Sequence, residues 1–175
     1  MMKYLLFLCV LGIVSCETTD REPVSQQVTG YAPVYATQQV ASSITSQPVK
    51  ASVHPGKIYA YNNYIFQVEQ NEGIHVIDNS NPQTAHKIAF ISIAGCTELA
   101  MKAGILYVNN LSDLVAIDLT NISTPQVVNR IANAFPQFNK QYPQVTGAYF
   151  ECVDPSKGVV VAWEEKTLTN PKCRR

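Results

Sequence analysis

The stretch Ile74-His75-Val76-Ile77-Asp78 has a second version in Leu114-Val115-Ala116-Ile117-Asp118, 40 residues further along the chain. Both are runs of aliphatic residues that end in Asp. The same offset aligns apolar positions upstream, namely Ala60 with Ala100, Ile65 with Ile105, Phe66 with Leu106 and Val68 with Val108. Downstream, the second version has an insertion within a turn, a change that repeats tolerate. We interpret residues 57–95 and 97–134 as two copies of one structural unit.

Each copy has the pattern of four short strands separated by turn residues such as Asn62-Asn63 and Asn79-Ser80-Asn81-Pro82. The pattern predicts strands at 57–61, 64–69, 74–78 and 86–93, and at 97–102, 105–109, 114–118 and 126–132. Apolar residues occupy both faces of these strands, so each sheet needs cover on both sides. Stacked propeller blades provide that cover, and a 40-residue period matches one four-stranded blade.

A further pair of strands, 146–153 and 159–164, is expected to form a C-terminal hairpin around Asp154-Pro155-Ser156. The predicted fold is therefore all-β, with two four-stranded propeller-like blades plus a C-terminal hairpin. Closed propellers have about four to eight blades, so we expect an open or incomplete propeller. The chain is then a short relative of a propeller, a module that another subunit completes, or a truncated copy of a longer protein.

The two aliphatic runs resemble the LVIVD repeat, a β-propeller-like repeat of bacterial surface and exported proteins. The likeness extends over Asn79-Ser80-Asn81-Pro82 and Leu106-Tyr107-Val108, and it is best between residues 55 and 123. It implies a propeller fold and an exported, lipid-anchored protein, and it implies no established catalytic residue. The chain departs from the pattern at Ala116, where the repeat has a bulkier aliphatic residue, and its two copies are too few to close a propeller ring.

The N-terminus has the features of a bacterial lipoprotein signal peptide. Twelve uncharged, mostly aliphatic residues follow Lys3, which is too few for a transmembrane helix and typical of a secretory signal. The run ends in Ile13-Val14-Ser15-Cys16, which resembles a lipobox. We therefore expect removal of residues 1–15 and attachment of lipid, including palmitate-type acyl chains, at Cys16. Because Glu17 follows Cys16, we expect an anchor in the outer membrane, facing the periplasm or the cell surface; an ordinary secreted protein is the alternative.

Residues 16–52 are interpreted as a lipid-anchored tether and extended segment, and residues 53–175 as the β-repeat domain. The first part, 17–29, is rich in polar residues and predicts a flexible spacer. The segment Tyr31-Ala32-Pro33-Val34-Tyr35 is more apolar, and we expect it to dock on the body as an extended segment. Val40 and Ile44 are spaced for one face of a helix, which alone is weak support for a helix.

Three cysteines remain in the mature body after signal removal and lipidation: Cys96, Cys152 and Cys173. In an oxidising compartment two of them can pair, and Cys152 with Cys173 is the candidate disulfide, because it ties the C-terminal tail to a predicted strand. Cys96 then reads as a small buried apolar residue. No two Cys or His residues have the spacing of zinc ligands, and we predict no metal site and no cofactor.

Asp78 and Asp118 each end a predicted strand, where a carboxylate accepts hydrogen bonds from the backbone of the following turn. We interpret both as structural turn caps rather than as metal ligands or acid–base groups. The histidines His54, His75 and His86 have no recognisable spacing of a catalytic triad, although triads are defined by geometry and not by order. The sequence also contains no nucleophile elbow and no phosphate-binding glycine loop. We therefore assign no catalytic residue.

The stretch Phe135-Pro136-Gln137-Phe138-Asn139-Lys140-Gln141-Tyr142-Pro143 combines aromatic residues with prolines. Rigid aromatic surface anchors protein partners, so Phe135, Phe138 and Tyr142 are candidate partner-binding residues. The alternative is a long connection that folds back over a poorly covered sheet. Trp163, in the last apolar strand, is interpreted as a core residue.

The composition excludes some classes of function. With 13 basic and 13 acidic residues the chain is neutral, which argues against a nucleic-acid partner. With 46% hydrophobic residues it is too apolar to be disordered throughout. We consider three hypotheses: a non-enzymatic binding or scaffolding module with a protein or glycan partner or with itself, an envelope hydrolase or lyase with an acidic and His site, and an inactive truncated copy of a longer propeller lipoprotein.

Overall fold

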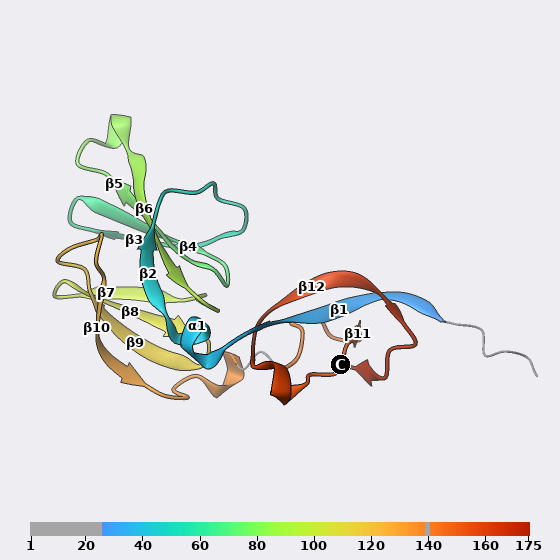
Figure 1. The fold of residues 1–175 in the computed structure, drawn as a ribbon. Helices are drawn as coiled ribbons and strands as arrows, with labels where there is room; N and C mark the ends of the chain where they lie inside the picture. Colours follow the sequence, from blue (N-terminus) through green and yellow to red (C-terminus); the bar gives the residue numbers. More distant parts are fainter. Residues whose placement is uncertain (1–25, 139–140) are drawn as a thin grey trace, which may run out of the picture.

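A computed structural model describes residues 26–138 and 141–175. In this part of the chain the fold is all-β, with thirteen strands in three sheets and one short α-helix (Figure 1). The predicted signal peptide, residues 1–15, and the predicted lipidation site, Cys16, lie outside the described residues.

The first repeat forms an antiparallel meander of four strands, and the predicted strand positions are confirmed to within two residues. Asn62 adopts a φ of 51° in its first hairpin turn, as the Asn-Asn pair predicted. An additional strand from the preceding segment, β2, pairs with the last strand of the meander. The first sheet thus has five strands in the order β2-β6-β5-β4-β3. Their bounds are β2 Ile44–Gln47, β3 Pro55–Tyr61, β4 Tyr64–Glu69, β5 Gly73–Asp78 and β6 His86–Ile93.

The second repeat forms the second sheet, again an antiparallel meander, in the order β10-β9-β8-β7. Its hairpin turns contain residues with positive φ, Ala103 and Gly104 in one and Leu111 in the other. The bounds are β7 Leu99–Lys102, β8 Ile105–Asn110, β9 Asp113–Asp118 and β10 Gln126–Ile131. The prediction of two consecutive β-meanders is therefore confirmed.

The core lies between the first and second sheets, which pack face to face. Alternate residues of each strand point into it, as the period of two in a strand requires. Full burial of one aliphatic side chain stabilises the fold by roughly 1.5–3 kcal/mol. The buried members are Phe66, Val68, Ile74, Val76, Ala89, Ile91 and Ile93 of the first repeat, Cys96 between the repeats, and Leu99, Met101, Leu106, Val108, Val115 and Ile117 of the second. The prediction that Cys96 is a buried apolar residue is confirmed, and burial raises the pKa of its thiol to about 12.

The 40-residue alignment is wrong by one residue between β5 and β9. Phe66 and Leu106 both face the core, but Ile77 is half-buried on the outer face, whereas Ile117 is fully buried in the core. The cause is the turn that precedes each strand. The pair Glu69↔Gly73 closes the first hairpin and Asn110↔Asp113 closes the second, so the first turn is one residue longer. A shift of one residue exchanges the two faces of a strand.

The third sheet has the order β12-β1-β11-β13, so the prediction of a C-terminal hairpin over 146–164 is wrong. The N-terminal strand β1 lies between its two expected halves. The long strand β12 has 11 residues and needs a partner of similar length; β1 has ten, whereas β11 has two. The bounds are β1 Gln27–Ala36, β11 Tyr149–Phe150, β12 Val159–Thr169 and β13 Cys173–Arg174.

Residues 16–52 are therefore more than a tether. The predicted spacer, 17–29, is wrong at its last residues, because β1 begins at Gln27. The expectation that residues 31–35 dock in an extended form is confirmed by β1. Helix α1, Gln38–Ser42, is too short to include Ile44, which begins β2, so Val40 and Ile44 do not share a helical face. Three short 3-10 helices complete the described structure: η1 Pro82–Thr84, η2 Pro136–Phe138 and η3 Pro155–Lys157.

Candidate functional site

Asp78 and Asp118 cap the turns that follow β5 and β9. Asp78 Oδ1 accepts a hydrogen bond of 2.8 Å from the backbone N–H of Ser80. Asp118 Oδ1 accepts two from Thr120, one of 2.7 Å from its N–H and one of 2.6 Å from its hydroxyl. Hydrogen bonds from the side chain and backbone of the residue two positions on lower the pKa of both carboxyls. Both oxygens are used by local turns, as the structural interpretation predicted.

The capping role predicts an order of stability. Asp78→Asn and Asp118→Asn are expected to lower the melting temperature only slightly, because an amide oxygen still accepts the turn N–H groups, and Asp118→Ala is expected to lower it more. Thermal unfolding followed by circular dichroism measures this order, with Glu164→Ala, at an exposed position of β12, as the control. Equal melting temperatures for the Asn and Ala variants would contradict the capping role.

The candidate partner-binding aromatics do not form one cluster in the described ring contacts. Phe135 and Phe138 contact each other at 5.6 Å between ring centroids. Tyr142 contacts Phe150 of β11 at 6.0 Å, and Phe150 contacts Trp163 of β12 at 5.5 Å. Tyr142 is 55% exposed, while Phe150 is buried. Tyr142 thus packs against the third sheet, in which Trp163 is a half-buried residue of β12, and Phe135 and Phe138 belong to a separate pair.

The candidate disulfide is present in the third sheet, where Cys152 and Cys173 are bonded. Cys152 lies two residues after the end of β11, and Cys173 begins β13, which pairs with β11 through Phe150 and Cys173. The bond closes a loop of 21 residues that contains the whole of β12. It therefore joins the C-terminal tail to β11, as expected.

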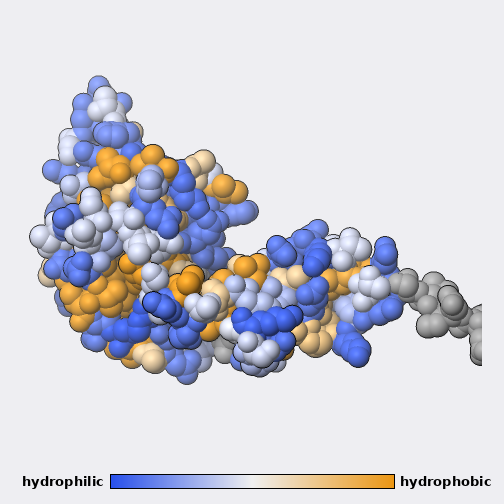
Figure 2. Space-filling view, viewed as in Figure 1, coloured by the Kyte–Doolittle hydropathy of each residue, from blue (hydrophilic) through white to orange (hydrophobic). Residues whose placement is uncertain are grey.

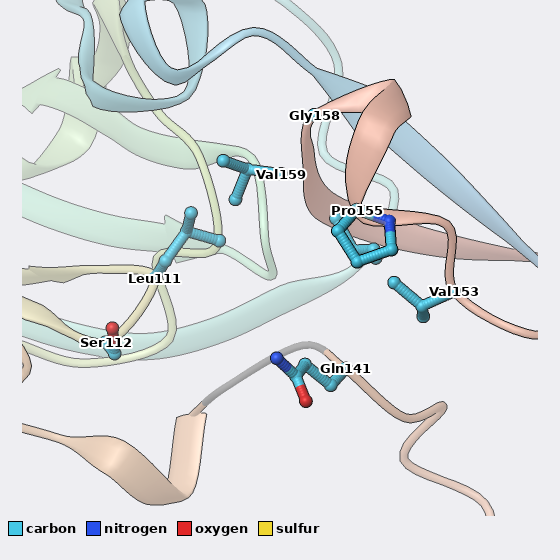
Figure 3. Close-up of a pocket in the computed structure, with 8 residues that line it drawn as sticks. Leu111, Ser112, Gln141, Val153, Pro155, Gly158 and Val159 are labelled. Carbon is cyan, nitrogen blue, oxygen red and sulfur yellow. The ribbon is translucent and has the colours of Figure 1, made fainter.

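A cavity of about 290 Å³ lies between the β8–β9 turn and the segment that leads into β12 (Figure 3). Leu111 and Val159 lie on one side of it, Val153 and Pro155 on the other, and Gln141 below. No side chain that lines this cavity is acidic, basic or a thiol. Ser112 supplies a hydroxyl, but no His or carboxylate lines the cavity to activate it, so we place no catalytic site there.

The structure brings together four ionisable residues that sequence spacing did not connect: His54, Glu69, Glu72 and His75, here called the His/Glu cluster. Glu69 ends β4 and Glu72 lies in the turn before β5, so the hairpin places them close together. His75 lies on β5, and its Nε2 is 2.9 Å from Glu69 Oε2. His54 lies just before β3, and its N–H donates to Glu69 Oε1 while its carbonyl accepts from the N–H of Gln70.

Glu69 is a buried, ionised carboxylate at the centre of the cluster. Its side chain and that of His75 are both fully buried. Burial by itself raises the pKa of Glu69, but hydrogen bonds from the His54 N–H, His75 and the Val53 N–H lower it to about 2. His75 Nδ1 has no hydrogen-bond partner among the described residues. A buried charge of this kind is tolerated only where several donors surround it.

The segment between β2 and β3 covers the outer face of the first sheet above this cluster. Lys50 Nζ lies 4.5 Å from the centroid of the Phe90 ring and forms an ion pair with Glu72. Ser52 Oγ donates to Gln67 Oε1 at 3.3 Å. Lys87 Nζ in turn donates to the carbonyl of Lys50 at 3.1 Å. Beside Lys50, Glu72 and Phe90, a cavity of about 340 Å³ separates the first sheet from the third.

The outer face of the second sheet has no such segment over it in the described structure, and we call it the open face. Three apolar side chains point to this face, because their neighbours in each strand face the core: Ile105 and Tyr107 of β8 and Leu114 of β9. All three are half-buried. Ile131 at the edge of the sheet is 53% exposed. Figure 2 shows hydrophobic side chains gathered over the second sheet.

The fold and these sites define an open, incomplete propeller-like all-β protein. Comparison of the chain with protein-family models, with curated proteins and with solved structures finds no match. The resemblance to the LVIVD repeat therefore stays a prediction. Among the described residues no helix has the length and apolar character needed to span a membrane.

Sequence reasoning missed the His/Glu cluster because its members come from three separate segments. The pair Glu69-x-x-Glu72 next to a turn glycine, Gly73, was the available signal for two neighbouring carboxylates. Nothing in the spacing indicated that the N–H of His54, fifteen residues before Glu69, donates a hydrogen bond to the Glu69 carboxylate. That proximity results from the pairing of β3 with β4.

Proposed function

We propose that this protein is a lipid-anchored module of the bacterial cell envelope that binds and scaffolds a protein partner without catalysing a reaction. The lipobox-like sequence ending in Cys16 supports the anchor, and Glu17 directly after it supports the outer-membrane location. The open face is the observation that carries the binding function. Apolar sheet surface in contact with water is costly, and proteins that keep it use it for association.

The partner that fits the open face best is a second copy of this chain. Lys102 of β7, Ile105 of β8 and Asp118 of β9 lie in one row across the sheet. A two-fold axis along β8 places Lys102 of each copy opposite Asp118 of the other, and it places Ile105 and Tyr107 against their own copies. Two sheets pack in this aligned way about 10 Å apart. The contact is self-complementary, as a two-fold interface must be.

The size of the full chain in detergent tests this proposal by analytical ultracentrifugation. We expect a dimer, and we expect two variants each to shift the chain to monomer. Tyr107→Lys places two cations next to each other on the axis. Lys102→Glu places a glutamate opposite Asp118 of the other copy, and the two carboxylates repel each other. Ile58→Lys is the matched control, because Ile58 is an exposed apolar residue on the first sheet, 60% exposed. A monomeric chain, or a dimer unaffected by both open-face variants, would contradict the proposal.

The enzymatic hypothesis has one observation in its favour, which is that the fold collects two His and two Glu residues. The Glu69 side chain, however, is fully buried, and Glu72 is paired with Lys50. General acid–base catalysis requires a group that reaches its substrate. A monomer with no affinity for any envelope component would favour the third hypothesis, a truncated copy of a longer propeller.

A further inference from the structure

The His/Glu cluster has the donor set of a metal site. One ligand atom from each of His54, Glu69 and Glu72 lies within 4.8 Å of the other two. One imidazole and two carboxylates are a common set for divalent transition-metal ions, which bind these atoms at about 2 Å. His54 and Glu72 are exposed, so their side chains can close the remaining distance, whereas Glu69 is held in place.

Hydrogen bonds from neighbouring groups hold the carboxylate of Glu69 in a fixed orientation, as a metal ligand requires. The N–H groups of Val53 and His54 donate to Oε1, the first at 3.0 Å, and His75 Nε2 lies 2.9 Å from Oε2. Ligating carboxylates in metal sites are usually oriented by such outer partners. His75 is itself fully buried, so its ring holds the Glu69 carboxylate in one orientation.

Lys50 shows that the cluster attracts a cation. Its ammonium group contacts Glu72 and lies over the ring of Phe90, and all three residues line the cavity between the first and third sheets. An ammonium group and a metal ion compete for the same carboxylate. Lys50 therefore occupies part of the coordination space that a metal ion needs, and the ion must displace it from Glu72.

We propose that His54, Glu69 and Glu72 bind one divalent transition-metal ion of the kind represented by Zn²⁺ and Co²⁺. We further propose that Lys50 regulates metal binding, because it competes with the ion for Glu72. The mixed nitrogen and oxygen donors favour these ions over Ca²⁺ and Mg²⁺, which prefer oxygen ligands alone. This site lies on the first sheet and is independent of the open face on the second.

Titration of the full chain with Zn²⁺ and with Co²⁺ tests the site, by calorimetry and by the visible absorption of bound Co²⁺. We expect one ion per chain, and at least about tenfold weaker binding in His54→Ala and in Glu72→Gln, since removal even of an outer-shell group costs 10–100-fold. His86→Ala is the matched control, because His86 is an exposed histidine outside the cluster, and its binding should equal that of the wild type.

Lys50→Met tests the competition directly. It should tighten Zn²⁺ binding several-fold, because it removes the cation paired with Glu72 and keeps the contact of the side chain with Phe90. A stabilising surface lysine without this role would leave Zn²⁺ affinity unchanged or reduce it. Absence of binding, binding that survives both His54→Ala and Glu72→Gln, or equal loss in His86→Ala would overturn the proposal.

Discussion

Replacement of Glu69 with glutamine is expected to lower the free energy of unfolding by about 3 kcal/mol at neutral pH. Glu69 accepts hydrogen bonds from two backbone N–H groups and faces His75, and the side chains of Glu69 and His75 are fully buried. The neutral amide of the glutamine is a weaker hydrogen-bond acceptor than the carboxylate, and its NH₂ group would face a group that donated to the carboxylate. A pKa lowered from 4.5 to about 2 corresponds to about 3 kcal/mol of stabilisation of the ionised form. Chemical denaturation in the presence of EDTA measures the change.

The same carboxylate predicts how stability depends on acid. Because the pKa of Glu69 is lower in the folded state than in the unfolded state, its contribution is complete above about pH 5 and is lost as the pH falls toward 2. The wild type should therefore lose about 3 kcal/mol over this range that Glu69→Gln does not lose. Glu98→Gln is the control, since Glu98 forms an exposed ion pair with Lys57, worth less than about 1 kcal/mol. Parallel pH profiles for wild type and Glu69→Gln would contradict the assignment.

Removal of the disulfide by Cys152→Ser with Cys173→Ser is expected to cost about 3 kcal/mol, and the loss should be confined to the third sheet. The bond closes a loop of 21 residues, and closure of a loop of this length restricts the unfolded chain by about that amount. Hydrogen exchange should become faster in β11, β12 and β13, since β13 has only two residues and two strand pairs to hold it.

Exchange in β5 and β9 is the internal reference for this prediction, because both strands are central in their sheets and share the core between the first and second sheets. Their protection should stay close to that of the wild type. If β5 and β9 lose protection as much as β12 does, the third sheet and the core unfold as one unit. Unchanged exchange in the third sheet would instead show that its backbone pairing alone holds the tail.

The strands of the two repeats were predictable because they depend on local pattern. The alternation of apolar residues around Phe66 and Val68, and around Leu106 and Val108, places one face of each meander in the core. The turn caps at Asp78 and Asp118 depend on residues two positions away, so they also follow from the sequence. The register between the copies did not follow, since a difference of one residue in a hairpin turn reverses the faces of β5 and β9.

The third sheet and the His/Glu cluster depend on contacts between distant segments. Strand β1 pairs with β12 across more than a hundred residues, and Gly30 allows this approach, because a Cβ there would lie 2.6 Å from Leu168 Cδ1 and from the carbonyl oxygen of Tyr149. The local sequence of β12 does not indicate which other strand pairs with it. Likewise, nothing near His54 in sequence identifies Glu69 as its hydrogen-bond acceptor.

Strand periodicity and turn chemistry act over a few residues, so the two β-meanders and their turn-capping aspartates could be predicted from the sequence alone. The sheet face that stays open, the strand that completes the C-terminal sheet, and the His and Glu side chains that meet were set by the folded arrangement of distant segments. These outcomes depend on chain segments that compete for the same surfaces and hydrogen bonds, and that competition is resolved only when the whole chain packs.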